Sequence, residues 1–179
     1  MRLALRFALI ALLLGPALAG AQDPGAKRDP MQHFFSPTLG DLALEAADAR
    51  STGKHAVLIM YTRDDCSYCE RMKANILALQ GIQDYFRKNF ALLAIDTRGA
   101  VPITDFAGKP TTERRFAQAQ GVKLTPTLVF YGFDGAPLAR VAGEIRAPQE
   151  FVLLGEFVAT GAYRKTSFTE YNLANKKGL

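Results

Sequence analysis

One stretch of the sequence constrains the fold more than any other: a short apolar run that leads into two closely spaced cysteines. Residues 56–61 form a continuous apolar run with β-branched members, which is typical of a strand buried on both faces. Cys66 and Cys69 follow after a few polar residues, and from Glu70 onward the residues favour helix. The sequence therefore predicts a strand, a C-x-x-C motif and a helix in direct succession, with Cys66 near the helix N-terminus.

These two cysteines are the only ones in the 179-residue chain. A bond between residues three apart closes almost no loop, so it stabilises the fold little through chain entropy. The unpaired N–H groups and the dipole at a helix N-terminus favour an anion, which predicts a lowered pKa for the Cys66 thiol. The Cys66 thiolate would attack a substrate disulfide, and Cys69, one turn on and more buried, would resolve the mixed disulfide. We expect this redox-active disulfide to act without a further cofactor.

Haem attachment, zinc binding and a purely structural role fit the cysteine pair less well. Haem attachment requires a histidine directly after the second cysteine, where this chain has Glu70. A zinc site needs four ligands, and the only histidines, His33 and His55, lie upstream and in no finger spacing. A structural disulfide would close too short a loop to stabilise the chain much. We therefore expect dithiol chemistry and no metal site.

A second motif, Thr125-Pro126, directly precedes another apolar run at residues 127–131. Proline cannot donate a hydrogen bond to a sheet ladder, so Pro126 is expected at the start of a strand. The bond before it is either cis or an ordinary trans bond.

The first 21 residues have the layout of a secretory signal peptide. Arg2 and Arg6 supply the basic start, residues 7–14 are apolar, and small residues offer cleavage after Ala19 or Ala21. An uncleaved membrane anchor is the alternative, but the apolar run is short for a span of about 20 residues. The sequence therefore predicts export, and we expect a periplasmic protein.

The remainder predicts one α/β domain over residues 37–161, between a flexible segment at 22–36 and a C-terminal extension at 162–179. Polar residues, glycine and proline in the segment at 22–36 favour a linker. Alternating helices and strands in the domain predict a central mixed β-sheet flanked by helices on both faces. Helices are expected at 37–52, from 70 to 88 with a break at Gly81, at 111–120 and from Ala147, strands at 56–61, 90–95, 127–131 and 137–141, and a loop at 98–110.

The charge pattern does not support a nucleic-acid-binding surface. The formal net charge is +5, but the basic residues are scattered, with no block longer than Lys176-Lys177. Aromatic side chains that could stack on bases are not interleaved with them. We expect no nucleic-acid partner and interpret these charges as solvated surface.

The order of these features resembles the thioredoxin superfamily: a strand, a C-x-x-C helix, a Thr-Pro before a strand, a hairpin and a final helix. The resemblance covers about residues 37–161. Within the superfamily the chain resembles the exported SoxW-like thioredoxins, which are relatives of the DsbC catalytic domain. Residues 61–69, residues 121–127 and Gly143 carry this closer resemblance.

The resemblance implies a thioredoxin-like fold and a role for each residue of the motif. Cys66 is implied to be the nucleophile and Cys69 the resolving thiol. The active-site neighbours that it implies are Tyr68, Thr125, Pro126 as a cis-proline packed against the pair, and Gly143. The backbone at Thr125 and around Gly143 is implied to hydrogen-bond an extended substrate strand.

The chain departs from ordinary thioredoxins at two positions beside the motif. The tryptophan before the first cysteine is replaced by Asp65, and the buried aspartate of the preceding strand is replaced by Met60. The proton of the resolving thiol must then go to water or to Asp64, Asp65 or Glu70. Asp64 and Asp65 should also raise the pKa of the neighbouring thiol, against the helix dipole.

We expect a thiol–disulfide oxidoreductase that reduces disulfides in exported proteins and, by analogy with SoxW-like proteins, receives electrons from a membrane thiol transporter. One alternative is a disulfide isomerase or oxidant of Dsb type. A DsbC-like isomerase needs a separate dimerisation domain, for which residues 22–35 are too few. The other alternative is a copper- or zinc-handling module that uses the same thiols. We expect the protein to act as a monomer.

Overall fold

The computed structural model describes residues 23–175. The predicted signal peptide at residues 1–21 lies outside this range, so its cleavage stays a prediction. Within residues 23–175 no helix is both long enough and apolar enough to cross a membrane.

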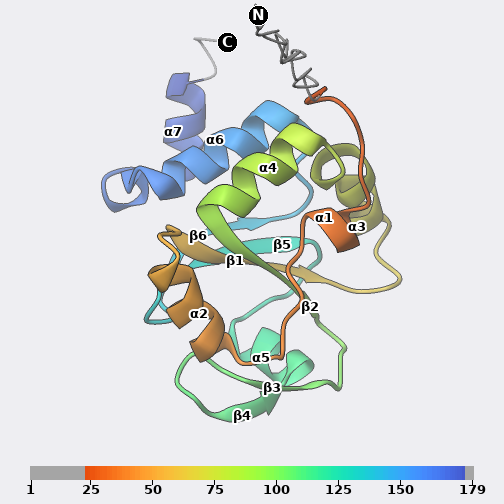
Figure 1. Cartoon of the computed structure of the whole chain (residues 1–179), viewed down its shortest axis with the longest axis vertical. Helices are drawn as coiled ribbons and strands as arrows, with labels where there is room; N and C mark the ends of the chain where they lie inside the picture. The colour runs from red at the N-terminus through yellow and green to blue at the C-terminus, as the bar shows by residue number, and fades with distance from the viewer. Residues whose placement is uncertain (1–22, 176–179) are drawn as a thin grey trace, which may run out of the picture.

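A four-stranded mixed sheet forms the centre of the structure (Figure 1), in the order β2-β1-β5-β6. The strands are β1 (Ala56–Thr62), β2 (Phe90–Asp96), β5 (Thr127–Tyr131) and β6 (Pro137–Ala142). β1 runs parallel to β2 and antiparallel to β5, and β6 returns antiparallel to β5 as a hairpin. The predicted strands and the mixed sheet are confirmed.

The central strand β1 is buried on both faces, which explains its continuous apolar run. Leu58 and Met60 belong to the cluster on one face of the sheet, whereas Ile59 and Tyr61 belong to the cluster on the other. Alternate side chains of a strand point to opposite faces, so a strand inside two layers needs apolar residues at every position.

Helices cover both faces of the sheet (Figure 1), as predicted. One layer contains α1 (Pro30–His33), α3 (Ser67–Met72), α4 (Gln80–Asn89), α6 (Pro148–Ala159) and α7 (Phe168–Asn175), and the other contains α2 (Leu42–Ser51) and α5 (Glu113–Ala119). The first layer is held by aromatic packing: the rings of Phe86 and Phe151 stack with centroids 4.0 Å apart. The same layer also contains both cysteines.

The prediction that residues 22–36 form a flexible linker is wrong for the part that the structure describes. Phe34 and Phe35 are buried, with 1% and 4% of their surface exposed, in the same apolar cluster as the cysteines. Arg28 donates hydrogen bonds of 2.6 Å to Gln83 and to Asp84 on α4. Burial of two adjacent phenylalanines outweighs the loop-forming glycine and prolines around them.

Helix α2 begins later than the predicted residue 37. The Asp41 side chain accepts a hydrogen bond from the Leu44 N–H and caps the helix, so α2 starts at Leu42. Leu39, which the helical periodicity included, is fully exposed. The preceding Gly40 has φ of 78°, a conformation that turns the chain into the helix.

The predicted loop at 98–110 contains a small antiparallel hairpin of β3 (Pro102–Thr104) and β4 (Pro110–Thr112). Each strand begins with proline, which is tolerated at a strand start or on a sheet edge. Proline and glycine suggested a loop because they usually end regular structure, and the three-residue strands between them are too short to show a period.

The helical segment after the cysteines is broken at Leu79 rather than at Gly81. α3 continues as a π-helical turn (Lys73–Leu77), and Leu79 forms an isolated bridge with Lys27 before α4 begins. Gly81 lies inside α4, where a Cβ would come within 3.2 Å of Pro24 Cβ. The glycine therefore makes room for the N-terminal segment.

The described part of the C-terminal extension packs on α6. A 3₁₀ turn (Ala162–Arg164) follows α6 and leads to α7. The Phe157 ring of α6 lies 5.6 Å from Phe168 and 5.2 Å from Tyr171, between ring centroids. Residues 162–175 thus add an aromatic layer to the domain.

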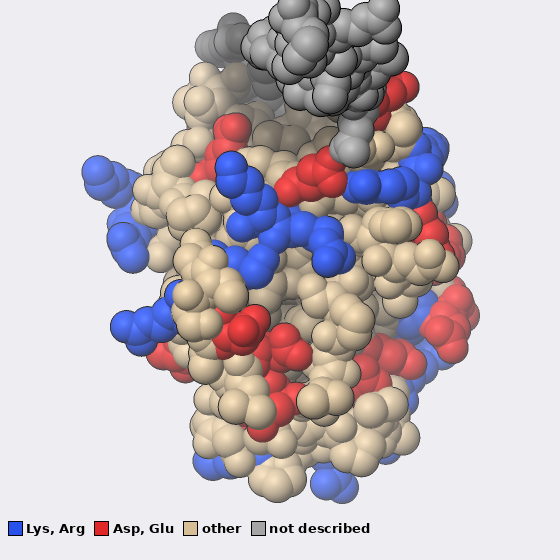
Figure 2. All heavy atoms as spheres, viewed as in Figure 1, with Lys and Arg blue, Asp and Glu red and all other residues tan. Residues whose placement is uncertain are grey.

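Charged side chains of both signs are spread among other residues on the face seen in Figure 2, and Lys and Arg gather over α4. At the end of this helix, Lys54 Nζ donates to the backbone carbonyl of Arg87. Burial and the nearby Arg87 guanidinium lower the pKa of Lys54. These cations lie where β1 and β2 begin, at the opposite end of β1 from the cysteines.

Candidate active site

Cys66 and Cys69 form a disulfide at the start of α3, with their Cα atoms 5.2 Å apart. Cys66 is the N-cap residue of the helix, and its Sγ accepts a hydrogen bond of 3.1 Å from the Cys69 N–H. Cys66 is 4% exposed and Cys69 is 0% exposed. The predicted place of Cys66 at the helix N-terminus and the deeper burial of Cys69 are both confirmed.

The Thr125–Pro126 bond is cis, as the resemblance implies. Thr127, the next residue, pairs with Tyr61 near the end of β1. Because the cysteines follow the end of β1, this pairing brings Pro126 to the same edge of the sheet. The motifs that the sequence singled out are therefore assembled at one edge.

Gly143 lies beside Pro126, and its N–H donates to the Pro126 carbonyl over 2.8 Å. The implied backbone contact from Gly143 to a substrate therefore cannot use this N–H, which is already bonded. The Gly143 carbonyl remains as the group that can accept. The φ of Gly143 is 102°, which favours glycine, and a Cβ added there would meet open space. The backbone conformation, rather than crowding, therefore requires glycine at this position.

A depression of about 410 Å³ lies next to the disulfide, lined by Tyr68, Leu124, Thr125, Gly143, Glu144 and Arg146. Three of these residues, Tyr68, Thr125 and Gly143, are active-site neighbours that the resemblance implied. The other three were not implied by it. Tyr68 and Leu124 are about half exposed, at 51% and 50%. The depression therefore presents apolar surface immediately beside a redox-active pair.

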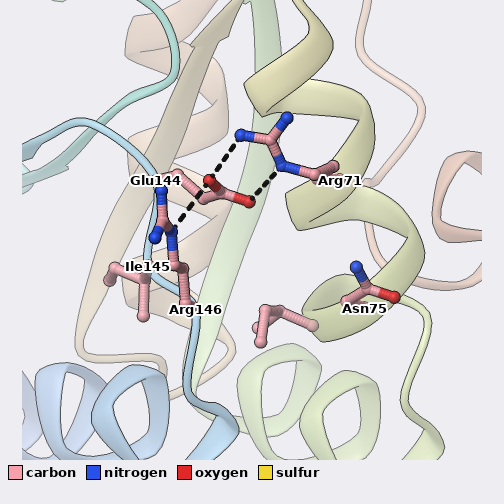
Figure 3. Close-up of a pocket in the computed structure, with 6 residues that line it drawn as sticks. Arg71, Asn75, Glu144, Ile145 and Arg146 are labelled. Carbon is pink, nitrogen blue, oxygen red and sulfur yellow. Dashed lines mark hydrogen bonds and ion pairs between the residues drawn. The ribbon is translucent and has the colours of Figure 1, made fainter.

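Glu144, which lines this depression, is held by two arginines. Figure 3 shows their contacts from a neighbouring pocket that Arg71, Asn75, Glu144, Ile145 and Arg146 line. The Glu144 carboxylate accepts hydrogen bonds from Arg71 Nε and Nη2, at 3.2 and 3.0 Å, and from Arg146 Nε at 3.3 Å. These bonds, first that from Arg71, lower the pKa of Glu144. The Arg71 guanidinium also lies over the Tyr68 ring, 4.4 Å from its centroid. Glu144 thus ties the active-site helix to the loop after β6.

Asp65, the residue directly before Cys66, is also paired with two arginines. Its carboxylate oxygens lie 2.7 Å from Arg63 Nε and 3.0 Å from Arg98 Nη1. The sequence suggested that Asp65 would oppose a thiolate at Cys66. Two adjacent cations offset that negative charge, so its effect on Cys66 is smaller than the sequence alone implied.

The surroundings of the resolving thiol are apolar. Met60, at the position of the missing aspartate, is fully buried in the same cluster as Cys69. Glu70, one of the three candidate proton acceptors, instead pairs with Lys73 at 2.9 Å and is exposed. Burial among apolar groups raises the pKa of a thiol, so reduced Cys69 is favoured as the neutral thiol.

Sequence reasoning missed the arginines and Glu144 around the disulfide. Arg71 and Glu144 are separated by 73 positions, and Arg98 and Asp65 by 33. No local period or motif marks such pairs, since they form only when β1, β6 and the loop after β2 meet. The one available signal for Glu144 was its place directly after Gly143, a glycine that the resemblance had already singled out.

Within the described part of the chain, no group of three or more His, Cys, Asp or Glu side chains is arranged to hold a metal ion.

The comparisons with known proteins agree with this architecture. A family model described as a thioredoxin-like domain matches residues 42–159. A thioredoxin-fold protein from Helicobacter pylori is 21% identical with a TM-score of 0.60, over 69% of this chain and 86% of that one. DsbH oxidoreductase is 17% identical with a TM-score of 0.58, over 82% and 94%. A thioredoxin from Thermus thermophilus is 23% identical with a TM-score of 0.50, over 64% and 81%.

Identities of this size show a shared fold and nothing finer. A sequence search of curated proteins finds no match.

Proposed function

The chain belongs to the thioredoxin-like family, and on that premise we propose that it is an exported thiol–disulfide oxidoreductase that reduces disulfides in exported proteins. One observation carries the proposal. The Cys66–Cys69 disulfide lies at the start of a helix just after the end of β1, and the cis-bonded Pro126 directly precedes the neighbouring strand β5. Such a pair is placed to exchange electrons with a second disulfide.

The reductive cycle follows from the burial and hydrogen bonds of the two sulfurs. In the reduced protein the Cys66 thiolate attacks one sulfur of a substrate disulfide, whose S–S bond breaks, and the leaving thiolate takes a proton. The Cys69 N–H, which lies 3.1 Å from Cys66 Sγ, favours the thiolate form of that sulfur. Attachment of a substrate at Cys66 leaves Cys69 in place one turn away.

The second step releases the substrate. Cys69 loses its proton and attacks Cys66 Sγ, the mixed disulfide breaks, and the second substrate sulfur leaves as a thiol. The substrate has then gained two electrons and two protons, and the protein holds the Cys66–Cys69 disulfide. Because Met60 stands where an acid could have served, the Cys69 proton passes to water or to one of the exposed carboxylates Asp64 and Asp65. A dithiol donor must then restore the reduced pair.

The cellular setting of the reaction is part of the proposal. The signal-peptide pattern of residues 1–21 supports the periplasm. The resemblance of residues 61–69 to SoxW-like thioredoxins supports a membrane thiol transporter as the electron donor and exported cysteine-containing proteins as substrates.

The test is reduction of insulin disulfides by the mature protein with dithiothreitol as the donor. We expect turnover well above the uncatalysed rate and its loss in Cys66→Ser. Cys69→Ser is the matched variant: it should keep the first attack and accumulate a mixed disulfide with the substrate. Wild-type turnover no faster than that of Cys66→Ser would overturn the proposal.

The direction of electron flow is tested separately by the reduction potential of the pair in a glutathione buffer. A reductant should have a potential near that of thioredoxin, about −270 mV, whereas an oxidant of Dsb type lies near about −120 mV. A value at the oxidising end would retain the dithiol chemistry and replace the reductase assignment by an oxidase.

A further inference from the structure

The depression beside the disulfide combines apolar walls with one exposed cation. Tyr68 and Leu124 are half exposed there, and Thr125 lines the same depression. The Arg146 side chain, which lines the same depression, is 77% exposed. A volume of about 410 Å³ falls in the range of about 300–1,000 Å³ that ligand pockets have.

The two arginines that hold Glu144 differ in how many of their donors are engaged. Arg71 bonds Glu144 through two nitrogens and lies over the Tyr68 ring. Arg146 donates to Glu144 through Nε alone. Since a guanidinium has five N–H donors, four of those on Arg146 make no hydrogen bond to Glu144. Together, Arg71, Arg146 and Glu144 carry a net charge of one positive unit, and Arg146 is the more exposed of the two arginines.

We propose that this depression is a specificity subsite for an acidic substrate segment. An aspartate or glutamate near the reacting cysteine would pair with Arg146, while an apolar neighbour packs on Tyr68 and Leu124. The preferred substrates are thus disulfides in acidic stretches of exported proteins. This inference rests on the proposed function and specifies the substrate class of the same site.

Charge complementarity sets the size of the expected preference. Arg146 is exposed, so its pairing with a substrate carboxylate is screened by water and salt. A pairing of this kind changes an equilibrium or rate constant about twofold to fivefold. The preference should therefore be modest, should decline with salt and should depend on Arg146.

The test uses two disulfide-linked peptide dimers that differ only at the residues flanking a central cysteine, Glu in one and Gln in the other. Single-turnover rate constants are measured with the reduced mature protein at low salt. We expect the Glu peptide to react about twofold to fivefold faster. At high salt, where the screening length falls well below that of a dilute buffer, the two rate constants should converge.

Two variants separate the subsite from the overall charge of the protein. Arg146→Gln leaves the Arg71–Glu144 contact in place and should abolish the preference for the Glu peptide. Lys88→Gln removes one exposed cation at the end of α4, next to the start of β2 and far from Cys66, and should retain it. Equal rate constants in the wild type, or a preference that survives in Arg146→Gln, would overturn the subsite.

A binding measurement keeps the two proposals distinguishable. The oxidised protein is titrated with the same peptides carrying serine in place of cysteine, and amide chemical shifts of Tyr68 and Leu124 are followed. Tighter binding of the Glu peptide that depends on Arg146 supports the subsite even if no disulfide is reduced. Disulfide reduction without any difference between the peptides supports the oxidoreductase and rejects the subsite.

Discussion

Two carboxylates flank the disulfide, each held by two arginines, and they differ mainly in how far water reaches them. The Asp65 side chain, directly before Cys66, is 56% exposed, whereas the Glu144 side chain is 8% exposed. Asp65 pairs with Arg63, two positions away, and with Arg98 in the loop after β2. Glu144 joins α3 to the loop after β6, two segments that the chain connects only through the whole sheet.

The comparison shows that a carboxylate paired with two arginines can act mainly on structure or mainly on the reactivity of a neighbouring thiol. An exposed ion pair is screened and contributes little to stability, but its charge still acts on a neighbouring thiol. A shielded carboxylate with several charge-assisted hydrogen bonds fixes the segments that provide them, and its loss leaves those donors without a partner. We therefore expect Glu144 to matter for structure and Asp65 for the reactivity of Cys66.

The largest difference should appear in stability. Glu144→Ala removes the bonds from Arg71 and Arg146, and should lower the free energy of unfolding by about 1–2 kcal/mol. Asp65→Ala should change it by less than about 0.5 kcal/mol. Urea unfolding of the oxidised proteins measures both, and equal losses would mean that burial does not distinguish the two carboxylates.

The reactivity of Cys66 should reverse the ranking. Asp65→Asn removes a negative charge next to Cys66 and should lower the pKa of its thiol, whereas Arg98→Gln leaves Asp65 less compensated and should raise it. The reduced protein is alkylated with iodoacetamide near neutral pH. The rate should rise about twofold to fivefold in Asp65→Asn and fall about twofold to fivefold in Arg98→Gln. Lys88→Gln serves as the remote charge control. Changes of the same sign in both variants would contradict the electrostatic account.

Acid should weaken the contribution of Glu144 to stability. Its hydrogen bonds hold its pKa below the ordinary value of 4.5. A depressed carboxyl pKa adds stability that is present above the ordinary value and is lost as the pH falls through the lowered one. The stability difference between the wild type and Glu144→Gln should therefore be constant well above that ordinary value and shrink below it. A difference that grows in acid would have the wrong sign.

The elements around this site could be predicted from sequence where local patterns determine them. The strand predicted at 127–131 is observed at those residues, because a proline, an apolar run and a turn mark it within a few positions. The cysteines could likewise be placed at a helix start from the residues on either side. The buried Phe34 and Phe35 were missed since polar residues, glycine and proline surround them and their partners lie far along the chain.

Only the part of the site's chemistry that lies in short motifs could be predicted from the sequence. Cys66, Cys69 and Pro126 belong to short motifs and were found. The compensation of Asp65 by Arg98 depends on the loop after β2 folding back against the turn before Cys66, which no local pattern encodes. The sequence therefore indicated the reacting atoms, while the charges that tune them became visible only in three dimensions.

A third carboxylate, Glu113, extends the comparison to a group without an arginine partner among residues 23–175, and its substitution has the smallest expected effect. Glu113, at the start of α5, faces Asp96 rather than an arginine and accepts a hydrogen bond from the Asp96 N–H at 3.4 Å. Burial, with a further contribution from the Asp96 charge, raises its pKa. A raised carboxyl pKa gives stability that is present at low pH and is lost as the pH rises through the raised value.

Glu113→Gln should therefore stabilise the protein at neutral pH, by at most about 1 kcal/mol because the group is partly exposed. The gain, measured by urea unfolding, should disappear at low pH, where Glu113 itself is neutral. This is opposite in sign to Glu144→Gln, although both variants neutralise a glutamate near the sheet. If both variants destabilised the protein at neutral pH, the partner of the carboxylate would not decide the sign, and the contrast between carboxylates with and without arginines would fail.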